Sequence, residues 1–144
     1  RGLAASLALG ADGVWIGTRF IATPEARAVN GYKDALLSIR EDDTVISRAY
    51  TGKTCRVVRT EWTNQFEKNP SELKPFPEQA VISMKAGVNH LGYPSGTEVD
   101  PTREFMPCGQ GVGAIHELTP AGDIVREMVR EAERTLERVA AVRR

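Results

Sequence analysis

Apolar residues at a spacing of four open the chain and predict a helix over residues 1–10, with Leu3 and Leu7 on one face. Gly10 follows the last apolar position, where a glycine commonly ends a helix. Residues 13–16 then form a short apolar run, which is typical of a strand buried on both faces of a parallel sheet. The pattern therefore predicts a helix followed by a buried strand.

Residues 119–142 carry the clearest amphipathic pattern and predict a long helix. Thr119 is the expected N-cap, and Pro120 occupies the expected first helical position. Asp123 lies in the first turn, where a negative charge is favoured. The predicted buried stripe of this helix consists of Val125, Val129, Ala132, Leu136 and Val139.

Between these ends, the pattern predicts short elements separated by loops. A helix is expected within residues 24–40, where Gly31 could divide it into two pieces. Strands over residues 43–50 and 54–59 surround Gly52 and indicate a hairpin. We further expect a helix over residues 60–69 that Thr60 caps, a loop over residues 69–77, a helix over residues 78–88 and a loop over residues 89–113.

The charge balance weighs against a nucleic-acid partner. The 144 residues, a length that suits one domain, include 19 basic and 19 acidic side chains, and they form no basic tract. The last helix does carry a column of arginines, but glutamates flank it, so we interpret this face as solvated. The two sets are Arg126, Arg130, Arg134 and Arg138, and Glu127, Glu131, Glu133 and Glu137.

The remaining composition favours a cytoplasmic protein that contacts no membrane. No apolar run approaches the roughly 20 residues of a membrane-spanning helix, and we find no signal peptide. Cys55 and Cys108 do not make a disulfide framework, which favours a reducing compartment. We interpret Cys55 as a small core residue, and no basic residue adjoins Cys108 in sequence to activate its thiol.

Gly17 and Thr18 end the first apolar run and raise the question of phosphate binding. Helix, buried strand and Gly-Thr is the order of a unit in a (β/α)8 barrel, where the loops after the last strands often bind phosphate. A glycine lets backbone N–H groups approach an anion, and a threonine adds a hydroxyl donor. The alternative is an ordinary turn between a strand and a helix.

Two segments resemble the nitronate monooxygenase family, once called 2-nitropropane dioxygenases. Residues 1–26, RGLAASLALGADGVWIGTRFIATPEA, resemble the segment that follows the family's seventh strand. Residues 106–129, MPCGQGVGAIHELTPAGDIVREMV, are similar to its C-terminal Gly-Gln-x-Val-Gly stretch and closing helix. The resemblance implies an FMN-dependent barrel in a family that includes flavin-dependent enoyl reductases.

For the fold, the resemblance implies an α/β chain that forms the C-terminal part of a (β/α)8 TIM barrel, with its last strand and flanking helices, plus a small α+β cap domain. The end of the FMN-binding barrel would occupy residues 1–43. The cap, which would cover the barrel mouth, would span residues 44–118, and residues 119–144 would form a helix that packs on the barrel.

For the site, the resemblance implies two groups of residues around FMN. The first would touch the FMN phosphate, mostly through its backbone, and consists of Trp15, Ile16, Gly17 and Thr18. The second would approach the flavin from the cap domain and consists of Cys108, Gly109 and Gln110.

The chain also departs from the family. A full barrel needs about 250 residues, and the family's paired glycines and its histidine near the barrel mouth are absent. Arg1 stands where a methionine is usual and no capping residue precedes the first helix, so we expect a chain cut from something longer. His90 could touch substrate or be merely exposed, and His116 is expected to be structural. We therefore name no catalytic residue, and the histidines and cysteines lack the spacing of metal ligands.

The resulting hypothesis is the C-terminal part of an FMN-dependent oxidoreductase that acts on a small molecule and oxidises alkyl nitronates with oxygen. One alternative is an NAD(P)H-dependent flavin reductase of an enoyl or quinone substrate. An alternative of another class is a truncated, non-catalytic binding module. If the chain is part of an oxidoreductase, we expect the isolated chain to be inactive and to bind FMN weakly or not at all; as a binding module, the chain would itself be the functional unit.

Overall fold

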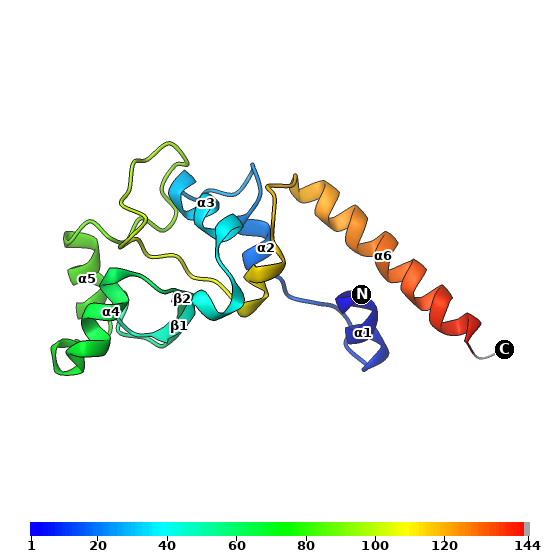
Figure 1. Cartoon of the computed structure of the whole chain (residues 1–144), viewed down its shortest axis with the longest axis horizontal. Helices are drawn as coiled ribbons and strands as arrows, with labels where there is room; N and C mark the ends of the chain where they lie inside the picture. The colour runs from blue at the N-terminus through cyan, green and yellow to red at the C-terminus, as the bar shows by residue number, and fades with distance from the viewer. Residues whose placement is uncertain (143–144) are drawn as a thin grey trace.

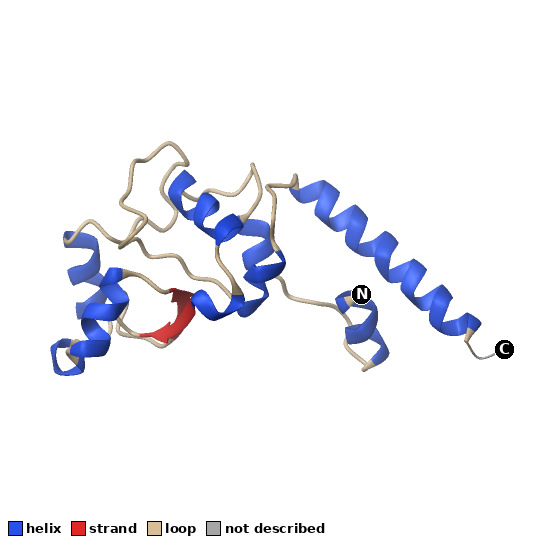
Figure 2. Cartoon of the chain, in the orientation of Figure 1, coloured by secondary structure: helices blue, strands red, loops and turns tan. Residues whose placement is uncertain are grey.

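The computed structural model describes residues 1–142 and is mostly helical (Figure 1). Within this part of the chain, two short strands form one antiparallel sheet (Figure 2). The helices are α1 (Gly2–Ala8), α2 (Thr18–Ile21), α3 (Asn30–Ser38), α4 (Glu61–Lys68), α5 (Glu78–Lys85) and α6 (Ala121–Ala141). The strands are β1 (Thr44–Ser47) and β2 (Cys55–Val58), and 3-10 turns form at η1 (Glu41–Asp43), η2 (Pro70–Glu72) and η3 (Gln110–Ala114).

The elements divide into a large lobe and a small one (Figure 1). The large lobe holds α2 to α5, the sheet and η3, whereas α1 and α6 pack on each other to one side. The amino group of Arg1 contributes to this second contact, since it lies 2.8 Å from the carboxylate of Glu131. Two stretches without regular secondary structure, residues 11–17 and 115–120, link the two lobes.

The hairpin and the helix after it form as the local sequence predicts. Thr44 pairs with Val58, and the backbone N–H of Gly52 in the connecting turn donates to the carbonyl of Arg48. At the start of α4, the hydroxyl of Thr60 accepts from the N–H of Thr63 at 3.2 Å, and the hydroxyl of Thr63 accepts from the N–H of Thr60 at 2.9 Å. This reciprocal pair satisfies two donors that a helix start otherwise leaves free.

Residues 104–109, which we call the central segment, run between two apolar clusters. The N–H of Val58 donates to the carbonyl of Met106 at 2.9 Å, and the N–H of Cys108 donates to the carbonyl of Arg56 at 3.1 Å. The central segment therefore lies along β2 as an irregular third strand. Phe105 belongs to the cluster around Trp62, whereas Met106 belongs to the cluster under α3.

Tyr50 anchors the central segment from the other side. Its ring stacks on Phe105, with 4.6 Å between ring centroids. Its hydroxyl lies 2.6 Å from the hydroxyl of Thr60 and 2.9 Å from the carbonyl of Glu104. Burial raises the pKa of this phenol, so the hydroxyl keeps its proton and can donate to a carbonyl of the central segment.

The predicted buried strand at residues 13–16 is wrong for the chain as described. The segment is extended but pairs with no strand in residues 1–142. Val14 is 41% exposed and Trp15 is 99% exposed. The apolar pattern is that of a strand buried on both faces of a sheet, but no other strand in residues 1–142 lies next to this segment.

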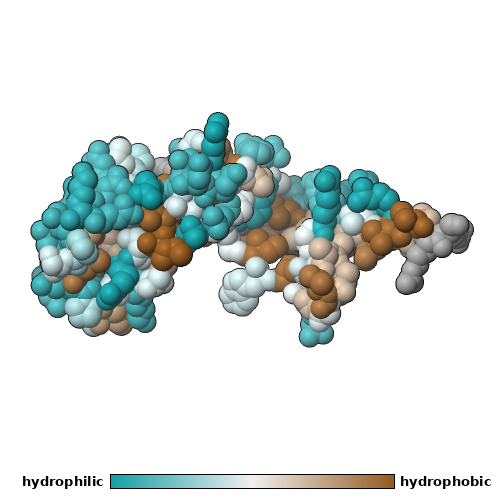
Figure 3. All heavy atoms as spheres, turned by 60° about the horizontal axis from the view of Figure 1, so that its bottom comes forward, coloured by the Kyte–Doolittle hydropathy of each residue, from teal (hydrophilic) through white to brown (hydrophobic). Residues whose placement is uncertain are grey.

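The prediction for the last helix is correct in position and wrong in its cap and its burial. Pro120, not Thr119, is the N-cap, because the hydroxyl of Thr119 instead accepts from the guanidinium of Arg19 at 2.5 Å. Of the predicted stripe only Ala132 is buried, and the other four residues, Val125, Val129, Leu136 and Val139, are 44–59% exposed. Apolar surface accordingly shows on α1 and toward the end of α6 (Figure 3). The amphipathic face of α6 is wider than the short α1 can cover.

The predicted helix within residues 24–40 begins late. Helix α3 starts at Asn30, and Gly31 lies in its first turn without breaking it. Residues 24–29 form turns, because Thr23 bonds locally: its hydroxyl accepts from the N–H of Ala26 at 3.1 Å. Such local side-chain bonds compete with helix formation.

We predict that Gly52→Ala destabilises the chain more than Gly87→Ala does. Both glycines have positive φ, so alanine is strained at either site, by about 1–2 kcal/mol. A Cβ at Gly52 would in addition lie 2.5 Å from the backbone nitrogen of Phe76, whereas nothing lies within 4 Å at Gly87. Urea unfolding of the two variants measures the difference, and equal losses would show that the chain can move away from Gly52 without cost.

Candidate functional site

The two segments singled out by the sequence meet in the structure. The hydroxyl of Thr18 accepts a hydrogen bond from the backbone N–H of Gly109 at 2.9 Å, across 91 residues of sequence. A Cβ built on Gly109 would lie 3.7 Å from the same hydroxyl oxygen, so the contact is close. The bond brings residues 15–18 and 108–110 to one place.

The first segment offers free donors. Within residues 1–142, the backbone N–H groups of Gly17, Thr18 and Arg19 donate to no other residue. Nothing lies within 4 Å of a Cβ built on Gly17, so the approach to this backbone is open. The hydroxyl of Thr18 accepts from Gly109 but keeps its own proton, which it can donate to a ligand. Ile16 is partly exposed and Trp15 is almost fully exposed beside them.

The second segment presents a glutamine next to this opening. Gly109 and Gln110 are exposed, and η3 begins at Gln110. The amide of Gln110 forms no side-chain hydrogen bond in the described part of the chain, so both its donor and its acceptor are available. Close behind the site, a Cβ on Gly113 would meet the carboxylate of Glu41, so η3 packs tightly against η1.

Cys108 lies behind the site and not in it. The side chain is buried at 5% exposure, and burial raises the pKa of its thiol to about 11, although the Arg56 charge opposes this shift. The hydroxyl of Tyr32 donates to the carbonyl of Pro107 and fixes the adjoining backbone. A thiol that is protonated at neutral pH is a poor nucleophile, so Cys108 has the properties of a packing residue.

The histidines lie away from the meeting of Thr18 and Gly109. His116 is exposed before α6. His90 lies in the predicted loop, where its ring Nδ1 is 2.7 Å from the carboxylate of Glu104, a residue that is 1% exposed. Nothing in the sequence pattern distinguished Glu104, because an acidic residue next to Arg103 is ordinarily assigned to the surface.

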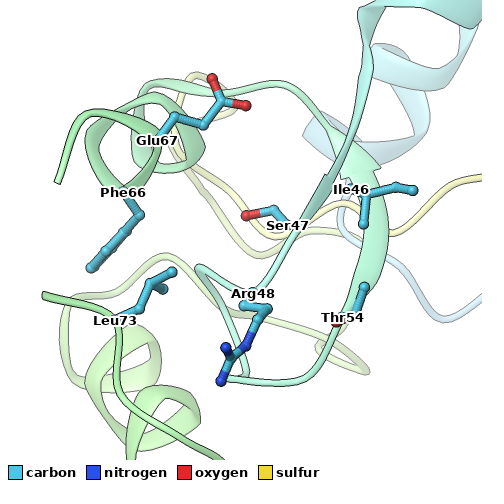
Figure 4. A pocket seen from close by; sticks show the side chains of 7 residues that line it. All are labelled: Ile46, Ser47, Arg48, Thr54, Phe66, Glu67 and Leu73. Atoms are coloured by element: carbon cyan, nitrogen blue, oxygen red, sulfur yellow. The ribbon is translucent and has the colours of Figure 1, made fainter. Parts of the chain in front are cut away.

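A separate pocket of about 250 Å³ opens between the hairpin and α4 (Figure 4). Phe66 and Leu73 form its apolar wall. Its charged side chains are already bonded, since Glu67 pairs with Arg59 at 2.8 Å and the Nε of Arg48 donates to the carbonyl of Gly52. None of the residues predicted to bind FMN lines this pocket, so it does not belong to the candidate site.

Two further classes of site find no support within residues 1–142. No group of three or more histidine, cysteine, aspartate or glutamate side chains is arranged to hold a metal ion there. None of the described helices is both long and apolar enough to cross a membrane. The groups that the candidate site itself offers are backbone N–H groups, one hydroxyl and one amide.

We predict that Thr18→Val exposes the N–H of Gly109 to exchange. Valine matches threonine in shape but cannot accept the hydrogen bond, which contributes about 1 kcal/mol. Hydrogen exchange at Gly109 should therefore accelerate several-fold in Thr18→Val and remain close to the wild-type rate in Thr18→Ser, which keeps the hydroxyl. Unchanged exchange in Thr18→Val would show that another group protects Gly109.

We also predict an alkaline loss of stability that Cys108 causes. Because burial raises its pKa from 9.0 to about 11, the unfolded thiol ionises at lower pH than the folded one. The stabilisation of the folded state by the protonated Cys108 thiol is complete below pH 9.0 and is lost as the pH rises to about 11. The stability difference between wild type and Cys108→Ala, from urea unfolding, should shrink by at most about 3 kcal/mol over this range. A constant difference would contradict the assignment.

Comparisons with known proteins identify the family of the chain. The nitronate monooxygenase family profile matches residues 1–131. The "Probable nitronate monooxygenase" of Staphylococcus saprophyticus is 38% identical over 138 residues, which cover 96% of this chain and 37% of that protein.

Two solved structures superpose well on the chain. FabK from Thermotoga maritima has a TM-score of 0.77 and 30% identity, and the match covers 98% of this chain and 43% of that one. Nitroalkane oxidase from Streptomyces ansochromogenes has a TM-score of 0.72 and 28% identity, over 94% of this chain and 38% of that one. The chain thus spans about two fifths of the length of the proteins it matches. On the family match and the sequence identity, the chain belongs to the nitronate monooxygenase family.

Proposed function

We propose that the chain is the C-terminal part of an FMN-dependent oxidoreductase that oxidises alkyl nitronates with oxygen. The observation that carries this proposal is the hydrogen bond between Thr18 and Gly109. It joins the two segments that the family resemblance assigns to FMN, although they are 91 residues apart.

The exposed apolar surface supports the proposal that this chain packs against the rest of a barrel. Val14 and Trp15 are 41% and 99% exposed, in an extended segment with free backbone groups. Neighbouring barrel strands would pair with such a segment and cover its side chains. The exposed face of α6 would then pack on the outside of the same barrel. We propose that both surfaces are buried in the complete oxidoreductase.

The residues at the candidate site fit FMN. A phosphate needs several donors and an unobstructed approach, and the free N–H groups of Gly17 and Thr18, with the Thr18 hydroxyl, supply both. The amide of Gln110 offers a donor and an acceptor, which suits an edge of the isoalloxazine ring or a nitro group. When bound, FMN supplies the redox chemistry, and the protein positions it.

In this proposal, the chain's own residues bind the FMN phosphate and orient the flavin or the substrate. Thr18 would hold the phosphate with its proton while its oxygen keeps the Gly109 backbone in place. Gln110 would orient the flavin or the substrate from an exposed position. Buried Cys108 would support this loop through its backbone bond to Arg56, without covalent chemistry at the thiol.

A second candidate function is an NAD(P)H-dependent reductase of an enoyl or quinone substrate. The superposition on FabK, with a TM-score of 0.77, favours it. The two functions differ in the electron donor, so they separate in one comparison. A nitronate monooxygenase would consume nitronate and oxygen without NAD(P)H, whereas a reductase would consume NAD(P)H. Failure to bind flavin under any condition would favour the third alternative, a non-catalytic binding module.

We predict that Gly17→Val weakens FMN binding in the complete oxidoreductase. A branched side chain would fill the open approach and keep the phosphate from the backbone donors. Charge-assisted hydrogen bonds contribute about 1.5–3 kcal/mol each, so the dissociation constant should rise roughly tenfold or more. Gly96→Val is the matched control, because that glycine also has open space around it but lies in another loop. Flavin fluorescence titration measures the FMN dissociation constants of both variants. A wild-type constant in Gly17→Val would show that Gly17 forms only a turn and does not bind the phosphate.

A further inference from the structure

The pocket between the hairpin and α4 has an apolar wall that the core behind it holds in place (Figure 4). Phe66 is buried, and its ring packs edge-on against Trp62, with 5.3 Å between the ring centroids. Leu73 packs against the same apolar cluster. On the hairpin side, Ile46 lines the pocket and is 59% exposed. The pocket therefore combines a fixed apolar wall with access from solvent.

The volume of the pocket, about 250 Å³, limits the size of a ligand. An engineered apolar cavity of about 150 Å³ admits benzene, so this pocket has room for an aromatic ring with a short substituent. Sites for drug-sized ligands are larger, at about 300–1,000 Å³. We therefore expect a molecule of about ten non-hydrogen atoms.

The charged side chains of the pocket favour an uncharged ligand. They are one of each sign, Arg48 and Glu67, and both are exposed. Glu67 already pairs with Arg59, and the Nε of Arg48 donates to the carbonyl of Gly52 at 2.9 Å. An ion pair between a ligand and an exposed side chain contributes little to affinity. A charged ligand would therefore lose its hydration against the apolar wall without a sufficient gain.

The hydroxyl of Ser47 gives the pocket one hydrogen-bond donor. Its Oγ accepts from the backbone N–H of Ala49 at 3.1 Å, but within residues 1–142 it donates its own proton to no other residue. Ser47 is half-buried, and Figure 4 shows its side chain pointing toward the side of the pocket that Phe66 and Leu73 form. A carbonyl oxygen on a ligand can accept this proton. The second hydroxyl, of Thr54, is exposed, so water can satisfy it.

We propose that this pocket is a binding site for a small, neutral aromatic molecule that carries one carbonyl group, of the size of an aryl ketone. The aromatic ring lies against Phe66 and Leu73, and the carbonyl oxygen accepts a hydrogen bond from the hydroxyl of Ser47. The pocket does not include the meeting point of Thr18 and Gly109, so the site stands whether or not FMN binds there.

The test adds acetophenone to the 144-residue chain labelled with nitrogen-15 and follows the backbone amide resonances by NMR. We expect saturable shifts at Ile46, Phe66 and Leu73, with a dissociation constant on the order of 1 mM. Trp15 is 99% exposed and reports non-specific contact with apolar surface, so its amide should show no saturation in this range. Benzoate, a charged analogue of similar size, should bind roughly tenfold more weakly or worse.

Leu73→Trp tests the place of binding, because the larger side chain would fill the pocket from its wall. We expect the saturable shifts at Ile46 and Phe66 to be lost in this variant. Leu118→Trp is the matched control, since it makes the same change at an exposed leucine that does not line the pocket, and it should bind acetophenone as wild type does.

Ser47→Ala tests the hydrogen bond. The acetophenone dissociation constant should rise roughly two- to tenfold in this variant, and it should stay unchanged in Ser71→Ala, at an exposed serine of η2. Toluene, which has the ring but no acceptor, should bind wild type and Ser47→Ala equally, so a general distortion of the pocket would be detected. No saturable shift at the pocket residues, equal saturation at Trp15, benzoate binding as tight as that of acetophenone, or unchanged constants in Leu73→Trp and Ser47→Ala would overturn the proposal.

Discussion

The hydrogen bonds of the central segment, residues 104–109, are the constraint on which the rest of the large lobe depends. Met106 and Cys108 bond to β2, and the N–H of Phe105 donates to the carbonyl of Val88 at 2.8 Å on the other edge. The segment therefore joins the hairpin, α5 and both apolar clusters. One end of the segment carries Glu104, which bonds to His90, and the other end carries Gly109, which bonds to Thr18. These backbone hydrogen bonds therefore fix the positions of the residues at both ends of the central segment.

The local elements could be predicted because their causes lie within a few residues. The Thr60 cap, the turn at Gly52 and the amphipathic pattern of α6 can all be read from the sequence, and the structure confirms them. Burial could not be predicted in the same way. The stripe on α6 and the apolar run at residues 13–16 were assigned to the interior, but the described chain supplies too little surface to cover them.

The two contacts between distant residues differ in how far the sequence pointed to them. The family resemblance assigned both segments to one FMN but did not predict the bond between Thr18 and Gly109, because no pattern of spacing links residues so far apart. The pairing of His90 with Glu104 was missed altogether. Both residues lie in a stretch rich in glycine and proline, where periodicity carries no information on which side chains turn inward. The tertiary fold alone makes Glu104 a buried partner.

The central claim is that Thr18 and Gly109 bring two segments together around FMN. Its most direct test is a crystal structure of the complete oxidoreductase with FMN bound. The account predicts that the FMN phosphate accepts hydrogen bonds from the Thr18 hydroxyl and the Gly17 backbone, with Gln110 beside the flavin ring. A flavin whose phosphate lies away from residues 15–18, with the bond between Thr18 and Gly109 still formed, would contradict it.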